Sequence, residues 1–352
     1  MEQVLQQFRE RIAAAHAART PLCLRGSGSK DWYGQAPAGE PFDTRAYRGI
    51  IDYEPSELVV TARCGTPLAE LEQALAAHNQ MLAFEPPHFG PGATVGGMVA
   101  SGLSGPRRQS AGALRDFVLG VDLVDGRGEL LRFGGQVMKN VAGYDVSRLL
   151  AGSLGTLGLL ANVSLKVLPR PVRELTLGFA FDQQQAIDKL NAWGGRALPV
   201  VSSAWADGRL ALRLAGADAA VVAAASELGG EVMPASESFW DGLREQRHAF
   251  FAGDGPLWRL AVPSTTPALA LPGPQLIEWG GGLRWLRGDA DGDTIRTIAA
   301  QHGGHATLFR GGDKRHGVFA LLQPALARIH QRLKDSFDPA GIFNPARMYN
   351  EF

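Results

Sequence analysis

Small residues and a lysine follow a short apolar run near the N-terminus, in the sequence RGSGSK of Arg25–Lys30. The preceding PLCL predicts a buried strand, so this loop leaves a strand end. Residues without bulky side chains let successive backbone N–H groups converge on an anion. The spacing lacks the gap of a Walker loop, and Asp31 stands where a dinucleotide fingerprint needs its third glycine. By itself, RGSGSK fits an anion site and an ordinary turn equally.

Two further stretches rich in small residues occur in the N-terminal half. They are EPPHFGPGATVGGMVASGLSGP at 85–106 and GSLGTLGLLANVSLKVLP at 152–169. Flexible linkers of this kind are polar and repetitive, but apolar residues interrupt the first stretch with helix-like spacing, namely Val95, Met98, Val99 and Leu103. We therefore expect an ordered ligand loop that runs into a short helix. With RGSGSK, these loops would let the backbone approach an extended ligand with phosphates, and hydroxyl donors would come from Ser27, Ser29, Thr94 and Ser101.

Periodicity and capping residues predict the elements that position these loops. Val4, Leu5, Phe8 and Ile12 share one face of an N-terminal helix. LVVTARCG at 58–65 predicts a strand, and the next helix begins with Thr66 as N-cap and Pro67 at its first position. Asp125-Gly126 predicts the turn of a β-hairpin.

After Pro169, strand-like and helical segments alternate. Hairpin-type turns join many of the strands, for example at Asp207-Gly208 and around the glycines 280–282. This pattern predicts an antiparallel α+β sheet with helices on one face, not a doubly wound parallel sheet. The last segment, 324–349, predicts a helix followed by a tail rich in proline and glycine.

Composition limits the function classes. A chain of 352 residues is long enough for about two domains. Lys plus Arg equals Asp plus Glu, at 35 each, so no net charge attracts nucleic acid or anionic lipid. The two cysteines, Cys23 and Cys64, form no CxxC pair, which argues against a zinc or iron–sulfur site. No signal peptide or long apolar run is visible, so we expect a cytoplasmic protein, and any attachment to a membrane would have to come through a partner.

The three loops together resemble a known flavoprotein family. RGSGSK, ATVGGMVASGLSG and KNVAGYD…LLAGSLGTLGLL resemble the FAD-binding domain of the vanillyl-alcohol-oxidase (PCMH) type, and FDPAGIFNPARM resembles the C-terminal tail of that superfamily. EPPHFG, FGGQVMKNVAGYD and FWDGLREQR are similar to the FAD-binding subunits of bacterial glycolate oxidases. The resemblance covers nearly the whole chain and is most specific in the first 170 residues.

The resemblance implies a non-covalent FAD and a role for each loop. The first loop would wrap the pyrophosphate through main-chain N–H groups, and Thr94–Gly97 would make further pyrophosphate and ribityl contacts. Ser101–Gly105 would lie under the flavin, and Gly152–Leu159 would approach the adenosine, with Leu159 contacting adenine. The implied cofactor-binding residues are Arg25, Gly26, Ser27, Gly28, Ser29, Lys30, Thr94, Val95, Gly96, Gly97, Ser101, Gly102, Ser104, Gly105, Gly152, Gly155 and Leu159.

The chain departs from its relatives late in the sequence. Many 2-hydroxy acid dehydrogenases of the superfamily carry HxGDGNxH, which supplies metal ligands and a base, but the nearest stretch here is QHGGHATLF with His302 and His305. We expect no metal site there and assign no catalytic residue. We interpret His88 as an ordered loop residue. The spacing of Trp240, Arg244 and Arg247 predicts one helical face that could clamp a carboxylate or lie on a sheet edge.

These observations predict an α+β chain with a two-lobed PCMH-type FAD-binding domain at 1–170, an antiparallel α+β cap at 171–322, and a C-terminal helix and tail at 323–352 that return to the FAD domain. The favoured function is the FAD subunit of a glycolate (2-hydroxy acid) oxidoreductase. Its partners would be a second FAD-containing subunit, which carries most of the substrate chemistry, and an iron–sulfur subunit. The alternatives are a free-standing FAD-dependent dehydrogenase and an assembly subunit with structural FAD.

Overall fold

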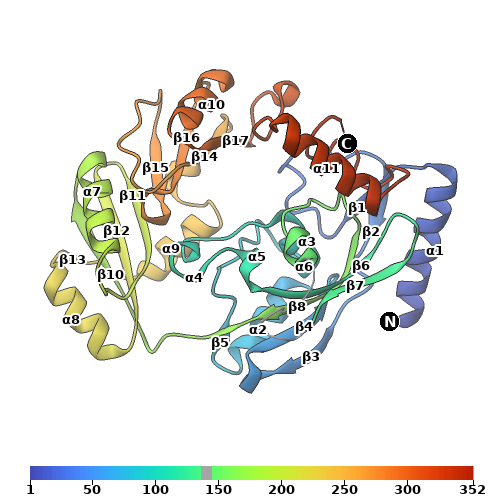
Figure 1. Ribbon diagram of the computed structural model, residues 1–352. Helices are drawn as coiled ribbons and strands as arrows, with labels where there is room; N and C mark the ends of the chain where they lie inside the picture. Colours follow the sequence, from blue (N-terminus) through green and yellow to red (C-terminus); the bar gives the residue numbers. More distant parts are fainter. Residues whose placement is uncertain (136–144, 352) are drawn as a thin grey trace. The chain divides into compact units, whose positions relative to one another are not determined.

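The computed structural model describes residues 1–135 and 145–351 (Figure 1). Residues 139–144 of the KNVAGYD motif therefore lie outside the described residues. Close contacts divide the chain into two compact units. The first comprises Met1–Leu103, Ala113–Pro169 and Leu321–Phe352, and the second comprises Ser104–Gly112 and Arg170–Ala320. Ser104 and Gly105, which we expected in the FAD domain, lie in the short stretch that groups with the second unit.

The first unit contains a five-stranded antiparallel sheet, in the order β3-β4-β8-β6-β7, and a separate parallel pair β1-β2. A third pairing joins β5 and β9. Its elements are α1 (Glu2–Ala18), β1 (Leu22–Arg25), β2 (Glu40–Asp43), β3 (Ile50–Glu54), η1 (Pro55–Glu57), β4 (Val59–Arg63), α2 (Leu68–Ala76), β5 (Gln80–Met81), α3 (Val95–Ser101), α5 (Leu114–Phe117), β6 (Val118–Val124), β7 (Leu130–Gly134), α6 (Val146–Leu149), β8 (Leu159–Lys166), β9 (Leu168–Pro169) and α11 (Pro324–Phe337).

One apolar core joins segments that are far apart in the sequence. Ile12 of α1 and Phe42 of β2 are fully buried, and Phe8 contacts the Phe42 ring at 5.0 Å between centroids. Leu22 of β1 and Phe343 of the tail belong to the same cluster, and these two residues form a parallel bridge. The C-terminal tail therefore groups with the first unit and extends the β1-β2 pair by one bridge.

The start of α2 differs from the sequence prediction. The helix begins at Leu68, and Pro67 occupies the N-cap position in place of Thr66. The Thr66 hydroxyl accepts the N–H of Gly49 at 2.8 Å, and its carbonyl accepts the N–H of Val95 at 2.9 Å. Thr66 is fully buried. Tertiary contacts to α3 and to the loop before β3 thus engage the oxygens that local capping would have used.

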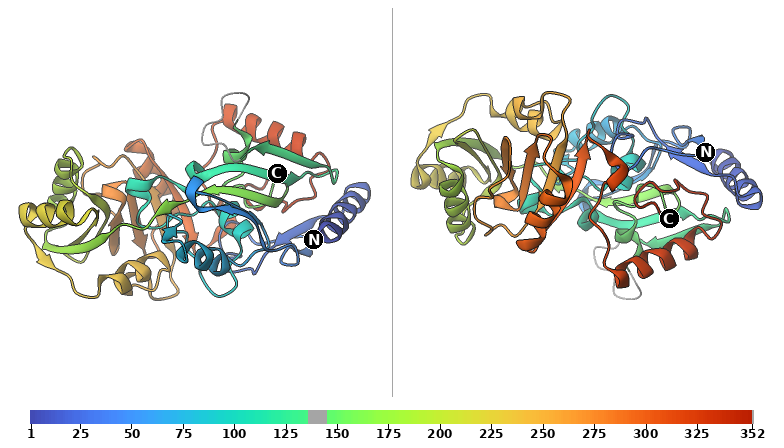
Figure 2. Two further views of the ribbon diagram at one scale, coloured as in Figure 1. Left: turned by 90° about the horizontal axis from the view of Figure 1, so that it is seen from below. Right: turned by 90° about the horizontal axis from the view of Figure 1, so that it is seen from above.

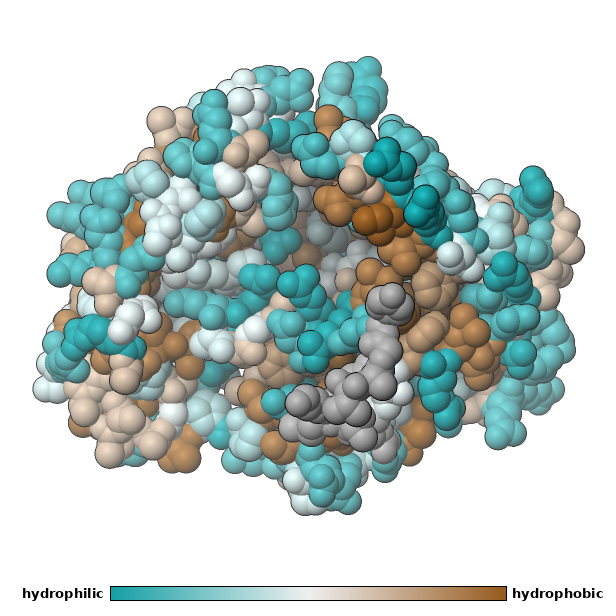
Figure 3. Space-filling view, in the orientation of Figure 1, coloured by the Kyte–Doolittle hydropathy of each residue, from teal (hydrophilic) through white to brown (hydrophobic). Residues whose placement is uncertain are grey.

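Helix α11 lies beside the β6–β7 hairpin, whose turn follows Asp125 as predicted (Figure 2). The rings of Phe133 and Phe337 are 5.9 Å apart, and the Gly126 N–H donates to the Phe337 carbonyl at 2.8 Å. Leu326 and Ile329, nearer the N-terminal end of α11, are about half exposed (49% and 52%), and Figure 3 shows apolar atoms gathered over this helix. The C-terminal end of α11 is therefore packed, whereas its N-terminal part carries exposed apolar residues.

The second unit is built on one eight-stranded sheet, in the order β13-β10-β12-β11-β15-β16-β14-β17. Every strand pair in it is antiparallel, which confirms the predicted α+β class. Its elements are α4 (Arg108–Ala111), β10 (Arg173–Ala180), α7 (Gln183–Gly194), β11 (Val200–Ala206), β12 (Arg209–Gly216), α8 (Asp218–Leu228), β13 (Glu231–Val232), α9 (Ser236–Arg244), η2 (Ala249–Phe251), β14 (Leu257–Ala261), β15 (Gln275–Glu278), η3 (Trp279–Gly281), β16 (Leu283–Arg287), α10 (Gly292–Gln301), β17 (His305–Arg310) and η4 (Lys314–His316).

The two faces of this sheet differ in chemistry. Leu210, Leu212 and Leu214 of β12 pack with residues of α7 and α8, and Leu260 of β14 packs with Ile295 of α10. Residues opposite each other in the register share a face, so these helices cover one face, as predicted. The other face carries both polar and aromatic residues, among them Thr176, Arg213, Arg259, His305 and Trp285.

Candidate functional site

The first two predicted loops meet at Gly26 and Thr94. A Cβ added to Gly26 would lie 2.4 Å from the Thr94 hydroxyl oxygen, so only glycine fits there. A Cβ on Gly92, whose φ is +78°, would lie 3.6 Å from that of Ser27. Thr94 also caps α3, because its Oγ1 accepts the Gly97 N–H at 3.1 Å. The short helix predicted after this loop is thereby confirmed.

The second and third loops meet at Gly102 and Gly152. Gly102 ends α3 in the left-handed conformation (φ +64°), and a Cβ there would lie 2.8 Å from the Gly152 Cα. The N–H groups of Gly152 and Leu154 donate to the carbonyls of Val99 and Ala100 at 3.0 and 2.8 Å. The three loops of the sequence analysis, up to Leu103 in the second loop, thus form one contiguous cluster in the first unit.

The backbone donors of this cluster are not equally available. The N–H groups of Val95 and Gly96 donate to the Thr66 and Cys64 carbonyls, and that of Gly97 donates to Thr94. By contrast, the N–H groups of Ser27 and Gly28 donate to no acceptor within the described residues. The first loop is therefore the part of the cluster with free main-chain donors for an anion.

Two cationic side chains lie at the first loop, and both have partners. Arg25 forms an ion pair with Asp31 at 2.6 Å. The Lys30 ammonium donates to the His88 carbonyl at 3.1 Å and lies 5.8 Å from the Phe89 ring centroid. The His88 imidazole is 2.9 Å from Glu72, which fits the interpretation of His88 as an ordered loop residue. Lys30 therefore links the first loop to the second.

The C-terminal tail holds the first and third loops. Asn344 accepts the Leu24 N–H at 2.7 Å and donates to the Leu154 carbonyl at 2.6 Å. Arg347 donates to the Asp31 carbonyl at 2.9 Å. Gly155, at φ +73°, has no room for a Cβ, which would lie 2.6 Å from the Asn344 amide nitrogen.

A buried ion pair completes this C-terminal anchor, which we define as Lys334, Asp338, Asn344 and Arg347. Lys334 lies 2.7 Å from Asp338 and donates to the carbonyls of Thr156 and Phe343 at 2.8 and 2.9 Å. Asp338 also accepts the Phe343 N–H at 2.7 Å. Burial lowers the pKa of Lys334 despite the nearby carboxylate. Sequence reasoning did not find these four residues, because only the tail resemblance pointed to the segment.

Other predicted residues lie in structural positions. The Ser101 hydroxyl donates to the Met98 carbonyl at 3.0 Å, and Leu159 is buried in the β8–β6 ladder opposite Val124. Helix α9 ends at Arg244, so the prediction that Trp240, Arg244 and Arg247 share a helical face is wrong. Arg244 and Arg247 instead pair with Asp241.

The late histidines are separated by the end of a helix. His302 is the C-cap of α10, and His305 begins β17. Burial, and then the charge of Arg259, lower the pKa of His305. In residues 1–135 and 145–351, no three His, Cys, Asp or Glu side chains are grouped as metal ligands.

The first-unit cluster has the features that an FAD diphosphate needs. It combines free N–H donors at Ser27 and Gly28 with cations at Arg25 and Lys30. The Cβ position of Gly152 has no atom within 4 Å, so this glycine faces open space. The residues present therefore fit a bound dinucleotide.

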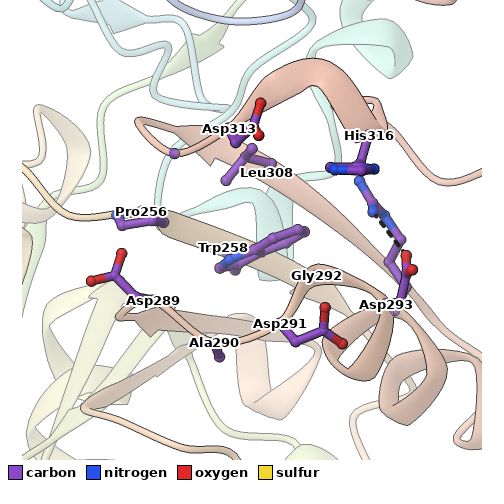
Figure 4. A pocket seen from close by; sticks show the side chains of 12 residues that line it. Pro256, Trp258, Asp289, Ala290, Asp291, Gly292, Asp293, Leu308, Asp313 and His316 are labelled. Carbon is purple, nitrogen blue, oxygen red and sulfur yellow. Dashed lines mark ion pairs between the residues drawn. The ribbon is translucent and has the colours of Figure 1, made fainter.

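A cavity of about 290 Å³ in the second unit has acidic side chains in its wall, unlike the loop cluster with its cations (Figure 4). Its wall includes Trp258, Arg296 and the carboxylates of Asp289, Asp291 and Asp293. Asp291 caps α10 by accepting the Thr294 N–H at 2.8 Å. Because acidic side chains dominate this wall, it is unsuited to a phosphate or carboxylate ligand. None of the predicted loop residues lines it.

Comparison with known proteins identifies relatives of the N-terminal part and of nearly the whole chain. A family described as an FAD binding domain matches residues 4–134. The glycolate oxidase subunit GlcE of Escherichia coli strain K12 is 49% identical over 346 residues, which cover 98% of this chain and 97% of that protein. The glycolate oxidase subunit GlcD of Bacillus subtilis strain 168 is 32% identical over 45% of this chain and 34% of that protein.

Two further matches bear on activity and fold. A D-lactate dehydrogenase of Archaeoglobus fulgidus is 31% identical over 46% of this chain and 36% of that protein. The solved structure of alkyldihydroxyacetonephosphate synthase superposes with a TM-score of 0.65, covering 96% of this chain and 73% of that chain at 14% identity. This likeness confirms the predicted fold class. In the described part of the chain, no helix has the length and apolar character needed to cross a bilayer.

Proposed function

Because the chain belongs to the family of FAD-binding glycolate oxidase subunits, we propose that it acts in a multi-subunit complex that oxidises glycolate to glyoxylate. The chain is an FAD-dependent oxidoreductase subunit. In this proposal a second FAD-containing subunit carries most of the substrate chemistry, and an iron–sulfur subunit accepts the electrons. Contact with the inner membrane comes through the partners.

The observation that carries the proposal is the loop cluster with its C-terminal anchor. Ser27 and Gly28 offer main-chain N–H donors to the pyrophosphate. Asn344 and Arg347 hold the loops through hydrogen bonds to the Leu154 and Asp31 carbonyls. We assign the remaining loop glycines and hydroxyl residues to the FAD site because their small side chains let the backbone approach the ligand closely. When bound, FAD supplies a two-electron acceptor that can pass electrons on singly. This chain's residues bind it, orient it and keep it in a fixed place.

Among the described residues, no three His, Cys, Asp or Glu side chains form a group that could hold a metal ion. Relatives named D-lactate dehydrogenase match less than half of this chain, so they support its FAD-binding part and not a free-standing activity. The relative that is a glycolate oxidase subunit matches 98% of this chain, whereas the D-lactate dehydrogenase matches 46%. We therefore favour a subunit of a complex over an independent dehydrogenase.

Purification of the tagged chain from its native source tests the proposal. We expect a second flavoprotein and an iron–sulfur protein to co-purify, with FAD in both flavoproteins and glycolate oxidation in the eluate. A chain that elutes alone, with glycolate turnover equal to that of crude extract, would contradict the proposal.

A further inference from the structure

Two arginines meet at one tryptophan in the second unit. The guanidinium carbon of Arg108 lies 4.3 Å from the Trp279 ring centroid, and that of Arg259 lies 5.2 Å from it. Arg259 lies opposite Trp285 in the β14–β16 register, on the sheet face that α7, α8 and α10 do not cover. The site is therefore distinct from the carboxylate-lined cavity around Trp258, the neighbour of Arg259 on the other face.

The turn that carries Trp279 is held in a strained conformation. Trp279 has φ +54°, which is rare for a bulky residue and costs on the order of 1 kcal/mol. Arg284 is fully buried, and it donates to the carbonyls of Gly281 and Thr266 at 2.7 Å each. Arg284 thus holds the backbone that follows Trp279 and helps to keep the turn in this conformation.

The guanidinium of Arg259 has N–H donors that no hydrogen bond engages within the described residues. It donates to no acceptor and pairs with no carboxylate within residues 1–135 and 145–351, and Trp279 is its one recorded ring partner. Glu278 lies on the same sheet face, and its carboxylate accepts the Trp285 indole N–H at 2.7 Å, so it contributes one negative charge against the two guanidinium groups. The positive charge of Arg259 also contributes to the lowered pKa of His305, two residues from its strand partner Thr307. With the two guanidinium groups of Arg108 and Arg259 against the one carboxylate of Glu278, these three side chains carry a net positive charge that an anion would stabilise.

The Trp279 indole, on which Arg108 and Arg259 stack, also contacts Gly105 of a loop predicted to bind the flavin. Trp279 Nε1 donates to the Gly105 carbonyl at 3.1 Å. The Gly280 N–H donates to the Ser203 hydroxyl at 2.9 Å, which in turn donates to Gln109 at 2.7 Å. The turn therefore fixes the segment that includes Gly105, which the family resemblance assigns to the flavin.

We propose that Arg259, supported by Arg108 and Trp279, binds the carboxylate of a small 2-hydroxy acid. The planar guanidinium fork matches a carboxylate in two parallel hydrogen bonds. The inference rests on the proposed function for the identity of the acid, glycolate. It assigns to this chain a substrate-binding site of its own within the complex.

Isothermal titration calorimetry of the full-length chain with sodium glycolate tests the inference. We expect glycolate and acetate to bind and ethylene glycol, which lacks the carboxylate, to show no binding. Arg259→Gln should weaken glycolate binding by about tenfold or more, because a charge-assisted hydrogen bond is lost. Arg259→Lys, which keeps the charge but not the fork, should give a smaller loss.

The matched control is Arg209→Gln, which removes the same charge from an exposed position in the same unit (67% exposed). It should bind glycolate like the parent. Equal affinity in Arg259→Gln and the parent, or no glycolate binding by the parent, would overturn the inference. FAD content and co-purifying subunits, measured on the same proteins, test the proposed function separately, and Arg259→Gln should leave both unchanged.

Discussion

The Asn344 side chain donates to the Leu154 carbonyl at 2.6 Å and joins positions 190 residues apart. The same side chain accepts the Leu24 N–H at 2.7 Å, so one buried amide connects the strand before the first loop with the third loop. The tail is therefore part of the loop cluster and not an appendage to it.

Asn344→Ala should destabilise the chain and release FAD. The substitution leaves the Leu24 N–H and the Leu154 carbonyl without their partner, which costs about 1–3 kcal/mol for each buried group. Urea denaturation and the ratio of flavin to protein absorbance measure the two effects. Asn350→Ala, at an exposed position of the same tail, is the control and should match the parent. Parent-like stability and flavin content in Asn344→Ala would refute this role of the anchor.

Gly97→Val should abolish FAD binding, whereas Lys30→Ala should only weaken it. Inside the chain, a Cβ on Gly97 meets only the Thr94 hydroxyl, at 3.1 Å, so the main obstacle is to a ligand on the loop. Lys30 contributes about 1 kcal/mol or less as a partly solvated charge. Gly194→Val, where an added Cβ has no atom within 4 Å, is the matched control. Equal FAD content in Gly97→Val and the parent would show that the loop is misplaced.

FAD should leave the protein on acid precipitation, because the cysteines and the loop histidine of the described residues are poorly suited to covalent attachment. Burial raises the pKa of both cysteine thiols, so neither forms a thiolate readily. The His88 imidazole already contacts the Glu72 carboxylate, at 2.9 Å. We expect yellow supernatant, a colourless pellet, and FAD on chromatography. Flavin retained in the pellet would contradict non-covalent binding, and FMN in the supernatant would contradict a pyrophosphate site.

Stability should fall as the pH drops below 6.5, in part through His248. Burial lowers the pKa of this residue below its ordinary value of 6.5, against a smaller opposing effect of Asp207. At acidic pH the unfolded chain therefore binds more protons than the folded chain, and stability decreases as the pH falls through this range. His248 Nδ1 accepts the Phe250 N–H at 3.2 Å, a role that asparagine can keep. In urea titrations at pH 7.5, 6.5 and 5.5, His248→Asn should lose less stability on acidification than the parent. An identical dependence would exclude His248 as a contributor.

The sequence predicted those parts of the fold that depend on local chemistry. Apolar spacing located α1 and α3, and the dipeptides Asp125-Gly126 and Asp207-Gly208 located two hairpins. The approach of Gly26 to Thr94 and of Gly102 to Gly152 explains why small residues recur in loops far apart in the chain. The family resemblance, and not spacing, supplied the ligand.

Tertiary contacts decided what the sequence did not predict. Thr66 looked like an N-cap, but Gly49 and Val95 engage its oxygens. Arg247 had helical spacing from Trp240, but α9 ends before it, and Asp241 binds both arginines. Arg259 and Trp279 are twenty positions apart in unrelated patterns, and only the strand register and the strained turn bring them together.

The central claim is that this chain holds FAD yet depends on partner subunits for glycolate oxidation. Hydride removal from a 2-hydroxy acid needs a base within reach of the hydroxyl proton, and a missing general base costs about a hundred- to ten-thousand-fold in rate. The direct test is steady-state turnover of glycolate by the isolated, FAD-loaded chain with an artificial electron acceptor, compared with the reconstituted complex. We predict a turnover number at least about a hundredfold lower for the isolated chain. Comparable turnover in the two preparations would contradict the account and identify a free-standing dehydrogenase.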